Sequence, residues 1–176
     1  MVMKYISNKN GFTLIEMMCI MVIIGIIATI SFPKFETTIH RLQVRNTARH
    51  MVSTMRLARS NAISQKQQVG VHFDNEGTTM TMFVNTQNPT LYGFEAGDSV
   101  ISIDTLPRNF SSVYTEIYDP ENPGNGSVIV YMPNGTASIT TNLYFLAYSE
   151  KDDVDWGTIE VLAATGRTRL ASIESS

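Results

Sequence analysis

Two arginines near the carboxyl end of the chain are spaced for contact with an anion. Arg167 and Arg169 are separated by one residue, so in a β-strand both side chains would point to one face with their Cα atoms about 6.5–7 Å apart. Two guanidinium groups at that spacing can hold successive phosphates of a nucleic acid backbone without reading its sequence. The alternative is that they pair with carboxylates such as Glu160 or Asp155, or stay solvated.

The distribution of charge argues against a nucleic-acid partner. The chain has 176 residues and a net charge of −3. Residues 71–176 contain fourteen acidic side chains against four basic ones, namely Arg108, Lys151, Arg167 and Arg169. A polyanion normally needs a broad basic surface, which this part of the chain does not offer.

A single carboxylate, Glu16, lies within a long apolar segment. No other charged residue occurs between Phe12 and Phe32, and a helix of that length spans about 30 Å, the thickness of the bilayer's hydrocarbon core. A carboxylate at the bilayer centre costs about 2.5–3.5 kcal/mol and usually has a partner. Glu16 is therefore either an acid stabilised at a helix start at headgroup level, or a group that meets a positive charge on another chain.

The apolar segment is predicted to be a retained transmembrane helix over residues 12–32. A cleaved secretory signal would need a site with small residues after the apolar stretch, and the following residues, "ATISFPKF", are bulky. The positive-inside rule alone would favour a cytoplasmic carboxyl-terminal domain, because Lys34, Arg41, Arg45 and Arg49 closely follow the segment.

Residues for other chemistries are scarce. Cys19 is the only cysteine, so no intramolecular disulfide can form, and the three histidines (His40, His50 and His72) lack metal-ligand spacing. The acidic segment 150–155 lacks the spacing of an EF-hand loop and is predicted to be a solvated loop, with a calcium site as the alternative. We predict no enzymatic activity, no cofactor and no metal; a membrane-anchored periplasmic enzyme would need a site that the sequence does not supply.

The start of the chain resembles a known processing signal. The segment "GFTLIE", Gly11 to Glu16, follows a short polar leader with Lys4 and Lys9 and is similar to the motif of type IV pilins and pseudopilins. The resemblance implies cleavage between Gly11 and Phe12 by a prepilin peptidase and methylation of the new Phe12 amine. It also implies that Glu16 pairs with the Phe12 amine of a neighbouring subunit during fibre assembly.

The same resemblance implies the location and the shape of the helix. The chain would be a single-pass protein of the bacterial inner membrane with its head in the periplasm, and would then move into a fibre with other pilin or pseudopilin subunits. This placement overrides the positive-inside rule. Pro33 resembles the kinking proline of the family and would remove one helix hydrogen bond.

Two segments of the head narrow the resemblance to the GspH/FimT subfamily. "VYMPNGTAS", Val130 to Ser138, resembles its aromatic-x-Pro-x-Gly-Thr segment, although it also reads as a β-turn. "TGRTR", Thr165 to Arg169, resembles its Gly-Arg-x-Arg signature. The FimT branch is implicated in DNA uptake, which would assign DNA binding to Gly166, Arg167 and Arg169. Residues 85–125 resemble no known segment.

Residues 33–68 are predicted to extend the helix as an amphipathic segment. Residues 33–70 carry seven basic side chains against one acid, Glu36, and Arg41, Arg45 and Arg49 recur every four residues on one face. This face would be solvated or turned toward the fibre, with lipid headgroups or nucleic acid as alternatives. The apolar stripe predicted to pack on the head comprises Phe35, Ile39, Leu42, Ala48, Val52, Met55, Ala58 and Ala62.

Residues 69–176 are predicted to form a β-rich globular head. About eight period-two segments are separated by turn signals such as "DNEG", "DPENPGNG" and "PNG". With residues 1–11 as a leader peptide, the predicted fold class is α+β, in which a long N-terminal helix packs against antiparallel sheets.

The function that follows is that of a structural subunit. The chain is predicted to be a minor pseudopilin or pilin of the GspH/FimT type, near the tip of a type II secretion pseudopilus or a type IV pilus. The alternative is a DNA-binding minor pilin that acts in DNA uptake.

Overall fold

The structure is a computed structural model that describes residues 11–74, 79–87, 90, 92–107, 110–115, 127–148 and 154–175. Within these ranges, the side chains of residues 30–37, 111–115 and 175 are not described. The predicted leader lies outside the described residues except for Gly11, and so does most of the acidic segment 150–155.

A single helix, α1 (Leu14–Gln65), comprises 52 residues and includes Pro33. The hydroxyl oxygen of Thr13 accepts a hydrogen bond from the Glu16 backbone N–H at 3.2 Å, which is the cap expected at a helix start. The helix ends three residues before the predicted boundary, and Lys66 then adopts a φ of 54°. The chain divides into two compact units, Met1–Ile39 and His40–Ser176, and α1 contributes to both.

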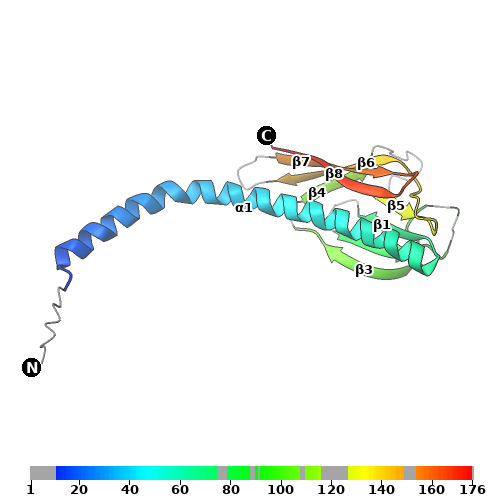
Figure 1. Ribbon diagram of the computed structural model, residues 1–176, viewed down its shortest axis with the longest axis horizontal. Coiled ribbons are helices and arrows are strands. Elements are labelled where there is room, and N and C mark those ends of the chain that lie inside the picture. Colours follow the sequence, from blue (N-terminus) through cyan, green and yellow to red (C-terminus); the bar gives the residue numbers. More distant parts are fainter. Residues whose placement is uncertain are drawn as a thin grey trace, which may run out of the picture. The chain divides into compact units, whose positions relative to one another are not determined.

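The second unit contains two four-stranded antiparallel sheets (Figure 1). The first sheet has the strand order β3-β2-β1-β5, and its strands are β1 (Val69–Phe73), β2 (Thr79–Val84), β3 (Ser99–Thr105) and β5 (Ser127–Tyr131). The second has the order β4-β6-β7-β8, and its strands are β4 (Phe110–Thr115), β6 (Thr141–Tyr148), β7 (Val154–Leu162) and β8 (Arg167–Ser175).

One core joins the helix to both sheets. The burial pattern of β6 alternates strictly between buried and less buried positions, as expected for a strand with one face on a core. The cluster contains Met51 and Met55 from α1, Phe73 from β1, and Phe110 and Phe145 from the second sheet. The predicted α+β class, with a helix packed against antiparallel sheets, is therefore confirmed.

The apolar stripe of α1 differs from the prediction at its start. Ile39 and Leu42 are 41% and 54% exposed, whereas Val44 and Met51 are fully buried. The true stripe recurs at spacings of three and four residues and consists of Val44, Ala48, Met51, Val52, Met55, Ala58 and Ala62. Ile39 and Leu42 were wrongly assigned because they lie nine and six residues before Ala48, which is about 2.5 and 1.7 helix turns, so both point away from the buried face.

A loop covers the outer face of the first sheet and accounts for part of the segment that resembled nothing known. Phe94 stacks on His72 of β1 and packs against Phe83 of β2, with ring centroids 5.1 and 4.9 Å apart. The buried carboxylate of Asp98 ties the loop together, because it accepts hydrogen bonds from the backbone N–H groups of Thr86, Gln87 and Glu95 at 2.9, 3.2 and 3.0 Å. This loop buries Phe83 completely.

Candidate functional site

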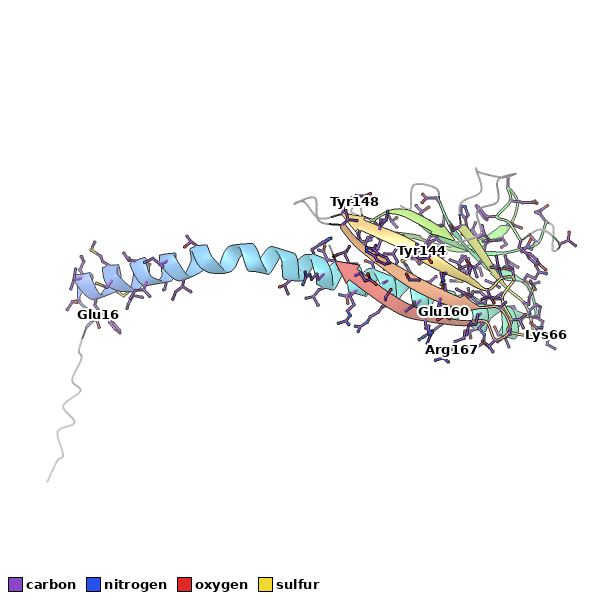
Figure 2. The ribbon with its side chains drawn as sticks, turned by 90° about the horizontal axis from the view of Figure 1, so that it is seen from above. Glu16, Lys66, Tyr144, Tyr148, Glu160 and Arg167 are labelled. Atoms are coloured by element: carbon purple, nitrogen blue, oxygen red, sulfur yellow. The ribbon has the colours of Figure 1, made fainter. Side chains whose placement is uncertain are left out.

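The carboxylate of Glu16 lies at the third position of α1, in an exposed apolar segment. Its backbone N–H is bonded to the cap residue Thr13, but its carboxylate makes no contact with a cation among the described residues. The sequence places the acid at the helix start, and Figure 2 shows it there. The positive end of the helix stabilises such an acid in part, and a full counter-charge would have to come from outside the described chain.

The apolar side chains around Glu16 are largely exposed in the described part of the chain. Phe12 and Leu14 are 76% and 78% exposed, and ten further large apolar side chains between Ile15 and Ile27 are 40–67% exposed. Among the helices of the described residues, none is long and apolar enough to cross a membrane. Exposed apolar area on this scale favours burial against a partner.

The two head motifs meet at one junction, formed by Arg59, Gly135 and Gly166. Arg59 Nε of α1 donates to the Gly135 carbonyl at 2.8 Å. Gly135 and Gly166 have φ angles of 84° and 60°, which a glycine adopts at little cost. A Cβ atom on Gly166 would lie 2.1 Å from the Gly135 oxygen and 2.8 Å from Arg59 Nε. Gly166 therefore permits a close backbone approach.

A second set of contacts lies beside this junction. Arg56 Nε and Nη2 donate to the Thr168 carbonyl of β8 at 3.3 and 3.1 Å. The Thr168 hydroxyl forms a buried 2.7 Å hydrogen bond with the Tyr131 hydroxyl of β5. Burial raises the pKa of Tyr131 to about 12, so the phenol stays neutral. These contacts connect α1, the first sheet and the second sheet.

The arginines of the Gly-Arg-x-Arg segment share one face, with the buried Thr168 between them. Arg169 Nε forms an ion pair with Glu160 of β7, which is its cross-strand neighbour. The pairing with Glu160, one of the two alternatives drawn from the sequence, is therefore present. The exposed Arg167 side chain projects from the ribbon (Figure 2) and has no acidic partner among the described residues. Of the two arginines, only Arg167 is therefore left without an acidic partner and available to bind an anion.

Each of the three histidines lies near an aspartate of the head. His40 Nε2 lies 3.8 Å from the buried Asp155 carboxylate, so Asp155 does not pair with an arginine. His50 Nε2 lies 3.7 Å from Asp104. Burial lowers the pKa of His72, although the nearby Asp74 opposes this effect. Within the described ranges, no three histidine, cysteine, aspartate or glutamate side chains gather where they could hold a metal ion.

The sequence did not reveal that Arg59 and Arg56 of α1 contact the two head motifs. Arg59 and Arg56 belong to the basic series of the helix, and nothing in the sequence separates them from Arg41, Arg45 and Arg49. Their carbonyl partners lie 76 and 112 residues away in the chain, so no local pattern could identify them. The glycines of the two motifs were visible signals of positive φ, but their mutual approach was not.

Comparisons with known proteins agree with this arrangement. Residues 6–32 match the prokaryotic N-terminal methylation motif, and residues 47–169 match the family described as type II transport protein GspH. A comparison with the sequences of curated proteins gives no significant match.

Two solved structures of the minor pseudopilin EpsH from the type II secretion system of Vibrio cholerae are similar to this chain. The first has a TM-score of 0.50 and 18% sequence identity, and the match covers 73% of this chain and 95% of the EpsH chain. The second has a TM-score of 0.50 at 16% identity and covers 76% and 96%. These identities support the shared fold, and the family match over residues 47–169 shows that the chain belongs to the type II transport protein GspH family.

Proposed function

We propose that the chain is a minor pseudopilin subunit of a type II secretion pseudopilus and acts near the fibre tip. The observation that carries this proposal is Glu16, a carboxylate on an exposed apolar helix segment with no cation beside it among the described residues. Such a group is unfavourable in an apolar bundle until a cation neutralises it. Family membership and the methylation motif support the same function.

The proposed mechanism begins with processing at the membrane. A prepilin peptidase cleaves between Gly11 and Phe12, and the Phe12 amine is methylated, so the chemistry belongs to another enzyme and not to this chain. The apolar segment 12–32 holds the subunit in the bacterial inner membrane, with the head in the periplasm. Residues 12–27 expose their large apolar side chains in the single chain, which is what a segment that packs among lipids or other helices requires.

Assembly then follows from the two properties of this segment. The apolar side chains are buried among neighbouring helices, which stabilises the bundle by removing apolar area from water or lipid. The Glu16 carboxylate pairs with the Phe12 amine of an adjacent subunit, so that neither charge is left unpaired in apolar surroundings. The head remains displayed on the surface of the fibre.

Mass spectrometry of the protein from cells with and without the peptidase tests the processing step. We expect a chain that begins at methylated Phe12 when the peptidase is present, and a chain that begins at Met1 when it is absent. A chain that keeps Met1 in membranes with active peptidase contradicts the proposed function.

Replacement of Glu16 by glutamine tests the assembly step, because it removes the charge and keeps the shape. We expect normal cleavage and a fall of about tenfold or more in incorporation into sheared fibres, since an amine left unpaired in an apolar bundle is strongly unfavourable. Met17→Leu, at the adjacent position, changes no charge and should leave incorporation unchanged. Equal incorporation of Glu16→Gln and wild type would remove the pairing role.

A further inference from the structure

The part of α1 in the second unit is strongly basic, and only some of its arginines contact the head. Residues 37–66 contain five arginines, one lysine and no acid. Arg56 and Arg59 are bonded to backbone carbonyls of the head. Arg41, Arg45 and Arg49 form an arginine row in which each side chain is exposed and has no hydrogen-bond or ion-pair partner among the described residues.

The arginine row is unfavourable in the isolated chain. Positions four apart on a helix are neighbours, and like charges at these positions destabilise the helix. Arg49 lies eight residues after Arg41, so the row extends over about 12 Å of the helix axis. The repulsion between the three arginines lowers the stability of the helix unless an anionic surface neutralises them.

The row lies on the flank of α1 that the second sheet follows. Arg45 and Arg56 are eleven residues apart, which is close to three full turns, so they lie on nearly the same side of the helix. Arg56 reaches the Thr168 carbonyl of β8, and β8 is the terminal strand of its sheet. The row is therefore on the side of α1 that faces the edge strand of the second sheet, as the described residues form it.

Four described acids of the same head have other partners. Asp155 lies beside His40, Asp104 lies beside His50, and Glu160 is paired with Arg169. The carboxylate of Asp98 is buried and bonded to backbone N–H groups. The arginine row thus has no ion-pair partner among the described residues, and another molecule can supply its counter-charge.

The geometry points to the arginine row as a docking surface for the acidic head of a neighbouring fibre subunit. Charge complementarity carries this assignment, because the head of this chain has fourteen acidic against four basic side chains and a related subunit with such a head would match the row. Carboxylates two residues apart on a strand are about 6.6 Å apart, close to the spacing of about 6 Å between arginines four apart on a helix. The inference rests on the proposed function, since it requires a fibre.

A contact of this kind joins different surfaces of successive subunits. One subunit contributes its basic helix flank and the next contributes its acidic head, which is a head-to-tail arrangement that extends into a filament rather than closing into a dimer. The same charges would attract the two surfaces before contact and would lose this attraction at high salt.

The test uses the full chain in cells that assemble the fibre. Arg45→Glu together with Arg49→Glu reverses two charges of the row, and Ser64→Glu together with Gln67→Glu adds the same acids at exposed positions outside it. We expect the arginine variant to be cleaved normally and to appear in sheared fibres at about one tenth of the wild-type level, because two attractions become repulsions. The control pair should stay within about twofold of wild type, since it leaves the row intact.

A photoreactive amino acid at position 45 identifies the partner directly. We expect a cross-link to another pilin-like subunit, and we expect the linked peptide to carry at least two carboxylates. A cross-link to lipid alone, or no cross-link in assembled fibres, overturns the inference. Normal incorporation of the arginine variant also overturns it while the proposed function stands; absence of the wild-type chain from fibres would instead contradict the proposed function.

Discussion

At the scale of single residues, the members of the Gly-Arg-x-Arg segment have separate roles. Gly166 permits contact between two turns, and Thr168 holds the buried Tyr131 hydroxyl. Arg169 is paired with Glu160, and only Arg167 projects without an acidic partner in the described part of the chain. Most of this segment therefore stabilises the head, and one residue of it is available to a ligand.

Replacement of Gly166 by alanine should destabilise the head by about 2–4 kcal/mol, because the methyl group would need a strained φ and would collide with the Gly135 carbonyl. Asparagine tolerates positive φ, but its Cβ would meet the same oxygen, so Gly166→Asn should also be destabilising. Denaturant unfolding of the purified chain in detergent measures both. Gly25→Ala, which adds a methyl group in open space, should change the unfolding free energy by less than about 1 kcal/mol.

At the scale of elements, the sequence predicts the strands whose apolar residues alternate along a short segment. The alternation along 141–148 and the turn residues between segments were sufficient to predict antiparallel strands. The end of α1 could not be predicted, because Lys66 adopts the left-handed conformation without a glycine or proline as a signal. The partners of Arg56 and Arg59 depend on contacts across the whole chain.

The loop that covers the first sheet also depends on contacts that no local pattern reveals. Its central residue, Asp98, is bonded to donors from three to twelve residues away in the chain. Burial alone would raise the pKa of the Asp98 carboxyl, but the three backbone N–H donors and the Thr86 hydroxyl hold the pKa below its usual value. The ionised carboxylate is thus the form that holds the loop together.

Replacement of Asp98 by asparagine should lower the free energy of unfolding by about 1–2 kcal/mol at pH 7, because an amide offers one acceptor oxygen where the carboxylate offers two. The lowered pKa means that the carboxylate stabilises the fold above the unfolded-state value of 3.8 and loses this effect as the pH falls through the lower folded-state value. The difference between variant and wild type should therefore be constant from pH 7 to about pH 5 and shrink only below 3.8.

Unfolding curves across this pH range provide the measurement, and a second acid supplies the comparison. Asp104 is a partly exposed carboxylate beside His50, so Asp104→Asn should cost less than about 1 kcal/mol. An equal loss for both variants, or a difference that disappears between pH 7 and pH 5, would show that Asp98 does not hold the loop in its ionised form.

At the scale of the whole molecule, charge is separated along the chain. The helix segment is basic and the head is acidic, and this separation favours contact between copies or relatives rather than contact with a polyanion. A nucleic acid backbone approaching Arg167 would also approach an acidic head, and it would gain one unpaired arginine in place of the broad basic surface that backbone binding requires.

Binding of double-stranded DNA at Arg167 and Arg169 should therefore be weaker than about 10⁻⁴ M at physiological salt, which is the weak end of non-specific binding. Any binding at the arginine row of α1 would persist in variants of these two residues. Glu160→Gln releases Arg169 from its ion pair and is the variant most favourable to DNA, yet it leaves the other acids of the head in place and should bind little better. A salt titration of wild type, Glu160→Gln and Arg167→Ala/Arg169→Ala distinguishes the outcomes, because phosphate contacts appear as a slope of log affinity against log salt. A slope that is present in the wild type and absent from the double alanine variant would make Arg167 and Arg169 a DNA contact. If log affinity does not depend on log salt in any of the three proteins, DNA is not a partner of these arginines, and the charge separation is left to act in the fibre.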